Sequence, residues 1–113
     1  MVRGIGTDIV TNSRFDGRDE KFLRRIFTAY ELEEMEKRAN RTEYLASRFA
    51  AKEAVAKALG TGFVGITPLD IEVREDEKGR PYVEFRRDMG VKIHLSISHE
   101  KDSSIAMAVA EDE

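Results

Sequence analysis

The chain has 113 residues, 41% hydrophobic and 36% charged, so it has room for one domain with one modest core and too many periodic apolar segments to be disordered. Its formal net charge of -3 carries no general signature of nucleic-acid binding. It has no cysteine and no run of the roughly 20 apolar residues that span a bilayer, which excludes disulfides, zinc-thiolate sites and membrane helices, and we expect a soluble cytoplasmic protein.

The first predicted element is a strand over Val2–Val10, in which apolar residues recur at alternate positions. Alternation divides its residues between two faces: Ile5, Thr7 and Ile9 on one, and Gly4, Gly6 and Asp8 on the other. The glycines leave space beside Asp8, a carboxylate that interrupts an otherwise apolar strand.

Residues 14–25 form the only obvious local basic excess, with five basic residues against three acidic ones. A helix here would present four of them on one face: Arg14, Arg18, Lys21 and Arg25. An anionic partner would have to meet such a local patch, and a merely solvated surface is the alternative.

Two helices follow this stretch. Thr28 and Glu31 have the spacing of a capping box and predict a helix that runs to about Asn40, whose acidic run over 31–36 we interpret as a solvated face. A second helix is predicted from Thr42 to Leu59. It ends at Gly60-Thr61-Gly62, which tolerate a left-handed C-terminal cap.

The second helix is apolar nearly all round, which is typical of a helix at the centre of a domain. Within its apolar part it also carries Arg48, Lys52, Glu53 and Lys57. Because burial of these charges without partners would be very costly, we expect them to emerge into a polar cleft or a subunit interface.

The remaining chain has the alternation of strands. Ile71 to Val73 and Tyr82 to Phe85, with Pro81 before the latter, flank turn residues at 76–79 and predict a hairpin. Residues 91–97 and 105–109 predict a second antiparallel hairpin. We therefore expect a single α+β domain over residues 1–113, with helices packed on an antiparallel sheet.

Glu53 and Lys57 are four residues apart and so lie side by side on a helix. An ordinary intrahelical ion pair explains this spacing as well as a functional site does. A site would need a second carboxylate, for which Asp8 is the natural candidate, because Mg²⁺ is commonly held by one or two carboxylates together with substrate phosphates. The alternative for Asp8 is an exposed strand-end residue.

Of the histidines, His99 at a strand end is a better site candidate than His94 within the strand, although a lone histidine is more often structural.

Three motifs, in the same order, resemble those of the small bacterial holo-acyl-carrier-protein synthases, which are 4'-phosphopantetheinyl transferases. They are Gly4-Ile-Gly-Thr-Asp-Ile-Val10, then Arg48-Phe-Ala-Ala-Lys-Glu-Ala-Val-Ala-Lys-Ala-Leu-Gly-Thr-Gly62, and Ser96-Ile-Ser-His99. The helix motif is highly specific, and the resemblance covers most of the chain. Two departures are the lack of acidic residues near Thr11 and Asn12, and a segment 85–91 too short for the family's usual helix.

The resemblance implies attack by a carrier-protein serine on the β-phosphate of coenzyme A, with release of 3',5'-adenosine bisphosphate. It implies that Asp8 and Glu53 bind magnesium and that Lys57 meets the pyrophosphate. Either Glu53 or a water that the metal holds would deprotonate the serine.

The same resemblance assigns further roles. Coenzyme A would be bound by Arg48 and His99 at its 3'-phosphate, by Gly60, Thr61 and Gly62 beside the nucleotide, and by Gly79, Arg80 and Pro81 against the adenine. The acyl carrier protein would dock on Arg14, with Arg18, Lys21 and Arg24 around it. The implied assembly is a homotrimer of 4'-phosphopantetheinyl transferase folds with a site at each interface, in agreement with a core too small to enclose a dinucleotide. We expect no nucleic-acid or membrane partner.

Two other functions remain as alternatives. A coenzyme A or nucleotide-binding regulatory module would keep the cleft without transfer, and the intact Asp8, Glu53 and Lys57 argue against it. A magnesium-dependent phosphohydrolase of nucleotide diphosphates would use water as its nucleophile, but no motif of clustered acidic residues is present.

Overall fold

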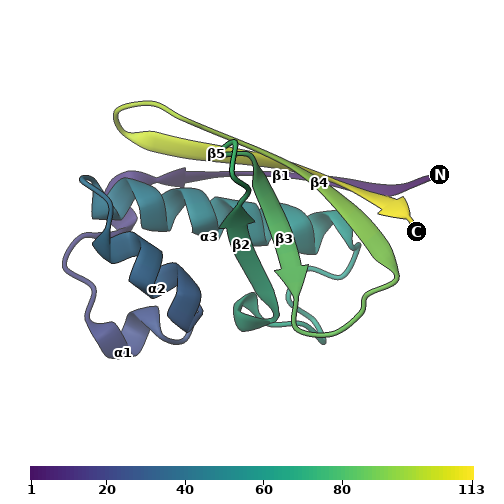
Figure 1. Cartoon of the computed structure of the whole chain (residues 1–113), viewed down its shortest axis with the longest axis horizontal. Helices are drawn as coiled ribbons and strands as arrows, with labels where there is room; N and C mark the ends of the chain where they lie inside the picture. The colour runs from purple at the N-terminus through teal and green to yellow at the C-terminus, as the bar shows by residue number, and fades with distance from the viewer.

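The computed structural model describes residues 1–113, and one long helix lies along a sheet (Figure 1). The elements in chain order are β1 (Val2–Thr11), η1 (Asn12–Phe15), α1 (Glu20–Leu23), α2 (Ala29–Glu36), α3 (Arg41–Ala58), η2 (Pro68–Asp70), β2 (Ile71–Glu75), β3 (Pro81–Phe85), β4 (Val91–His99) and β5 (Ser103–Asp112). The two chain ends lie close together at one end of the sheet (Figure 1). None of the helices has both the length and the apolar composition needed to cross a membrane.

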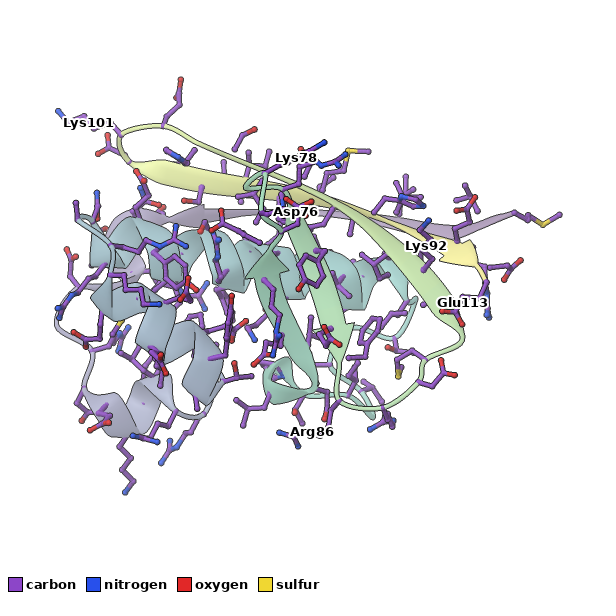
Figure 2. All side chains as sticks on the ribbon, viewed as in Figure 1. Asp76, Lys78, Arg86, Lys92, Lys101 and Glu113 are labelled. Carbon is purple, nitrogen blue, oxygen red and sulfur yellow. The ribbon has the colours of Figure 1, made fainter.

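The strands form two antiparallel sheets. β1, β5 and β4 make a three-stranded sheet in that order, so β1 and β4 are its edges. β2 and β3 form a separate hairpin, whose turn, marked by Asp76 and Lys78 in Figure 2, reaches the three-stranded sheet. The predicted α+β class, both hairpins and the antiparallel pairing are confirmed, with the first hairpin standing as a sheet of its own.

Helix α3 is central because small apolar side chains surround it. Its bounds agree with the predicted helix to within one residue, and Ala50 and Ala54 on it are fully buried. β5 turns three alanines toward it, Ala106, Ala108 and Ala110, none more than 1% exposed. Small residues on both sides let strand and helix backbones approach closely, which a core of larger side chains would prevent.

The glycines of β1 are required by this close approach. A Cβ atom added at Gly6 would lie 2.1 Å from the carbonyl oxygen of Ala54, and one added at Gly4 would lie 2.1 Å from that of Ala58. The space that the sequence places beside Asp8 is therefore filled by the backbone of α3, and only glycine permits the contact.

We expect Gly6→Ala to lower the free energy of unfolding by about 3 kcal/mol or more, because the added methyl group meets helix backbone that cannot move aside. Urea denaturation of the variant and the wild type measures this. Gly90→Ala is the control, since its Cβ would meet nothing within 4 Å and adds only the strain of a φ of 70°. Equal losses in the two variants would contradict the close-contact explanation.

The other face of the three-stranded sheet is apolar and uncovered. Its large side chains are Ile5, Ile9, Ile105 and Met107, which are 66%, 67%, 45% and 49% exposed. They come from β1 and β5 at neighbouring register positions, Ile9 opposite Ile105 and Thr7 opposite Met107. We call this set the outer apolar face.

Three local predictions are corrected. The capping box of Thr28 and Glu31 is present, but α2 ends at Glu36 rather than near Asn40. Glu31 is fully buried, so the acidic run is not wholly a solvated face. Residues 14–25 do not form one helix, because Gly17, at a φ of 67°, separates η1 from α1, and their basic residues do not share a helical face. No helix forms between β3 and β4, as the short segment predicts.

Candidate functional site

Asp8, Glu53 and Lys57 gather beside the edge strand β1. The Nζ atom of Lys57 lies 3.3 Å from Oδ1 of Asp8 and donates a hydrogen bond of 2.8 Å to the Thr7 carbonyl oxygen. No ion pair joins Lys57 to Glu53 in the structure, so the ordinary intrahelical pair that their spacing also allows does not form. The strand, rather than the helix, orients this lysine.

The carboxylates of Asp8 and Glu53 lie in an unfavourable pairing, which we call the carboxylate pair. Partial burial raises the pKa of Glu53, and the negative charge of Asp8 raises it further, while Lys57 and Arg14 oppose the rise. Lys57 and Arg14 do not cancel this rise, so the two carboxylates together still disfavour a second negative charge. A divalent cation between them would offset that charge.

Magnesium fits this set of donors. Both ligands are carboxylate oxygens, which Mg²⁺ prefers, and no group of three or more His, Cys, Asp or Glu side chains surrounds the position. Two protein ligands leave the remaining coordination positions to water and to substrate phosphate, the usual arrangement of a magnesium site that binds phosphates.

A second site lies at the opposite edge of the sheet, beside β4. A cavity of about 420 Å³ is lined by residues of α3, the β2–β3 hairpin and the end of β4. Arg48, His99, Gly79 and Pro81 all line it, and so do two residues that the sequence analysis did not single out, Arg38 and Glu43. Only 3 of its 12 lining residues are hydrophobic, which suits a polar ligand. We call this hollow the arginine cavity.

Arg48 lines this cavity, and only 7% of the residue is exposed. Three neighbouring side chains hold its guanidinium in place. Its guanidinium carbon lies 4.4 Å from the centre of the Tyr44 ring, Nη1 donates to Oγ of Ser47 at 3.0 Å, and Nη2 lies 3.5 Å from Oε1 of Glu75. Its Nε is buried without any acceptor. Because protein atoms enclose this Nε, its missing hydrogen bond is a cost within the fold and not a contact open to a ligand in the cavity.

The two histidines are separated as the sequence predicts. Nδ1 of His99 lies 3.3 Å from Oε2 of Glu43, which orients the imidazole at the cavity wall. His94 instead pairs with Glu111 across the β4–β5 ladder at 2.9 Å, on the opposite side of the sheet from α3. His99 is thus the histidine of the site.

Four residues predicted to bind the nucleotide lie outside the arginine cavity. Gly60, Thr61 and Gly62 cap the end of α3, where the Gly60 amide donates to the Lys57 carbonyl oxygen at 3.0 Å. Thr61 instead lines a smaller hollow together with Ala58 and Met89. The Arg80 side chain is 74% exposed and lies 3.5 Å from Asp76, in the same turn.

The predicted carrier-docking cations are placed unequally. Arg14 stacks over the Phe49 ring at 4.9 Å and is close enough to Glu53 to lower its pKa. The other three lie farther along the surface: Arg18 stacks on Phe22, Lys21 is exposed, and Arg24 is paired with Glu20 at 2.6 Å. Arg14 is therefore the one of the four that lies beside the carboxylate pair.

Lys52 does not emerge into a cleft, contrary to our expectation. It is 0% exposed, and its Nζ lies 2.8 Å from Oε1 of Glu31 and donates to the carbonyl oxygens of Pro68 and Ile71. The other oxygen of Glu31 accepts from the Val73 amide at 2.7 Å. This buried pair satisfies the lysine inside the core, and burial by itself lowers the lysine pKa.

The comparisons with known proteins identify the family. A family model described as the 4'-phosphopantetheinyl transferase superfamily matches residues 4–110. The holo-[acyl-carrier-protein] synthase of Halothermothrix orenii is 48% identical, over 99% of this chain and 99% of its own. The chain belongs to the holo-[acyl-carrier-protein] synthase family. The synthase of Clostridium tetani is 45% identical to it, over 100% of this chain and 98% of its own.

Solved synthases have the same fold. The holo-(acyl-carrier-protein) synthase of Bacillus anthracis, in complex with CoA (3',5'-ADP), is 40% identical with a TM-score of 0.91, over 100% of this chain and 99% of that one. The Helicobacter pylori synthase, in complex with coenzyme A, is 28% identical with a TM-score of 0.84, over 95% and 99% of the two chains. The predicted family and transferase class are confirmed.

Proposed function

We propose that this synthase transfers 4'-phosphopantetheine from coenzyme A to a serine of apo-acyl carrier protein and depends on Mg²⁺. The carboxylate pair with Lys57 beside it is the observation that carries this. The serine oxygen would form a bond to the β-phosphorus, while the bond from that phosphorus to the oxygen shared with the α-phosphate breaks. The leaving group is 3',5'-adenosine bisphosphate, and the serine proton goes to a base.

The residues of the carboxylate pair have distinct tasks. Asp8 and Glu53 would hold Mg²⁺, which when bound neutralises the charge on the phosphates. Lys57, held by the Thr7 carbonyl oxygen, would donate to a pyrophosphate oxygen as a point charge. Glu53, or a water that the metal would hold, is our candidate to accept the serine proton, because both would lie where the serine must attack.

The arginine cavity would hold the adenosine end of coenzyme A. Arg48 and His99, which both line the cavity, would donate to the 3'-phosphate. Gly79 and Pro81 at the hairpin turn line the same hollow and would contact the adenine. The solved relatives that bind coenzyme A support a ligand of this kind.

One chain does not present both sites to one ligand. The carboxylate pair lies at edge strand β1 and the arginine cavity at edge strand β4. Arg48 and Lys57 are nine residues apart on α3, about two and a half turns, so they project from opposite sides of the helix. We infer that a neighbouring copy supplies one of the two sites, in a homotrimer whose subunits meet through the outer apolar face.

The assembly has a direct test. We expect the wild type to sediment at three times the chain mass of 12.9 kDa, and Met107→Asp to be monomeric and inactive, because a carboxylate cannot be buried in the outer apolar face. Analytical ultracentrifugation measures the mass. Val64→Asp, at a side chain 79% exposed away from this face, is the matched control and should remain trimeric. An active wild-type monomer would contradict the shared site.

Arg14 is the carrier-docking residue that we propose first. It lies beside the carboxylate pair, where the serine of the carrier must arrive. Its forked donors suit the carboxylates of an acidic helix on the carrier. Arg18 and Lys21 would extend this contact. The Arg24 charge is already neutralised by Glu20, so Arg24 should contribute least.

The decisive experiment incubates the protein with coenzyme A, Mg²⁺ and apo-acyl carrier protein and weighs the carrier by mass spectrometry. A mass increase of one phosphopantetheine group, with 3',5'-adenosine bisphosphate released, is the expected result. An unmodified carrier with cleaved coenzyme A would indicate a hydrolase. Binding of coenzyme A without any turnover would indicate a regulatory module.

A further inference from the structure

Arg38, in the segment between α2 and α3, lies close to Arg48. It follows the end of α2, yet its guanidinium carbon lies 4.7 Å from the centre of the Tyr44 ring, the ring on which Arg48 also stacks. Its Nη2 donates to Oε1 of Glu75 at 2.7 Å, the same oxygen that Arg48 approaches at 3.5 Å. One aromatic ring and one carboxylate oxygen thus hold two arginines together.

This arrangement leaves donors unused at the wall of the arginine cavity. An arginine has five N–H donors, and Arg38 uses only one, from Nη2 to Glu75 at 2.7 Å, while Glu34 lies 3.6 Å from the same nitrogen as an ion pair. Its side chain is 32% exposed and lines the cavity. Arg48 lines the same cavity, and both guanidiniums lie over the Tyr44 ring. The free donors of Arg38, next to the charge of Arg48, match the several oxygens of a phosphate group.

The charges on the wall explain how the arginines are kept in place before a ligand arrives. Arg38 and Arg48 are offset by Glu75 and Glu43, so the wall is neutral when His99 is neutral. Glu75 fixes the Arg38 side chain, and its negative charge offsets the repulsion between Arg38 and Arg48. A phosphate would therefore be recognised by directed hydrogen bonds rather than by a large net charge.

We propose that Arg38 is a second phosphate-binding arginine of the cavity and a specificity-determining residue, which favours coenzyme A over its analogue that lacks the 3'-phosphate. Glu75 is the positioning residue that holds it. The proposal rests on the proposed function, because it takes the adenosine end of coenzyme A as the ligand of the cavity.

Calorimetric titration of the full-length protein with coenzyme A and with 3'-dephospho-coenzyme A tests it. We expect Arg38→Gln to weaken coenzyme A binding by roughly 10- to 100-fold and to leave dephospho-coenzyme A binding unchanged. Arg38→Lys, which keeps the charge but loses the fork, should give a smaller loss. Arg41→Gln is the matched control, because it removes an arginine nearby that pairs only with Glu36 on the surface.

The outcomes separate this proposal from the proposed function. A wild type that binds neither compound would overturn the proposed function itself. A wild type that prefers coenzyme A, with the same preference in Arg38→Gln, would overturn only the role of Arg38. Equal weakening for both compounds would also overturn it, since a structural role for Arg38 does not distinguish the 3'-phosphate.

Discussion

Asp8→Asn and Glu53→Gln should each reduce phosphopantetheine transfer by roughly 1000-fold or more, because either change removes a carboxylate from the only candidate magnesium site. Both replacements keep the size of the side chain, so the loss would reflect charge and coordination rather than packing. The transfer rate at saturating coenzyme A and carrier measures the effect. The Mg²⁺ concentration needed for half-maximal residual activity should also rise.

Stability distinguishes this loss from unfolding. The pKa of Glu53 is raised by burial and by Asp8, so the ionised side chain is less favourable in the folded chain than in the unfolded one. Glu53→Gln should therefore leave the metal-free protein at least as stable as the wild type at neutral pH. Glu33→Gln, on the exposed side of α2, is the control and should keep full activity. Near-normal transfer by both site variants would refute the metal assignment.

Lys52→Met should lower the free energy of unfolding by about 3 to 5 kcal/mol, because it leaves the fully buried Glu31 charge without its partner. Glu31→Gln should have a cost of the same order, since Lys52 would then be the unpaired charge. The double variant should lose less than the sum of the two, as neither charge remains buried alone. Urea denaturation of the wild type, the two single variants and the double variant measures this double-mutant cycle.

A surface ion pair serves as the comparison for this cycle. Lys37 and Glu34 are 2.9 Å apart, but the lysine side chain is 63% exposed, so Lys37→Met should change stability little. If the buried and the surface lysine variants behaved alike, the Glu31–Lys52 pair would not be a structural centre of the core.

The transfer reaction should be retained in Lys52→Met molecules that remain folded, because Lys52 faces away from the carboxylate pair.

Much of the local structure could be predicted from the sequence. The alternation of apolar residues predicts β1, β4 and β5, and the capping box predicts the start of α2, because these features depend on neighbours within a few residues. The glycines after Leu59 likewise end α3 in the left-handed conformation, with Gly60 at a φ of 83°. The family and its transferase class could also be recognised from the motifs. Residence in the cytoplasm stays a prediction.

The partners of the three cations in the apolar part of α3 were decided only by the tertiary structure. Periodicity shows which side of a helix a residue faces, but it does not show what packs there. Lys52 meets Glu31 from α2 and is buried, Lys57 meets Asp8 from β1, and Arg48 meets Glu75 from β2. These partners lie more than 20 residues away in the chain, so local spacing carried no signal for them.

The glycine-rich face beside Asp8 was likewise determined in part by the sequence and in part only by the tertiary structure. The sequence alone determined that Gly4, Gly6 and Asp8 share one side of a strand, because alternate residues of any strand do so. Only the packed structure decided that α3 fills that side, with a helix carbonyl oxygen 2.1 Å from where a Gly6 side chain would begin. Close packing of backbones depends on the global path of the chain, and that path places the carboxylate pair and the arginine cavity at opposite edges of one small sheet.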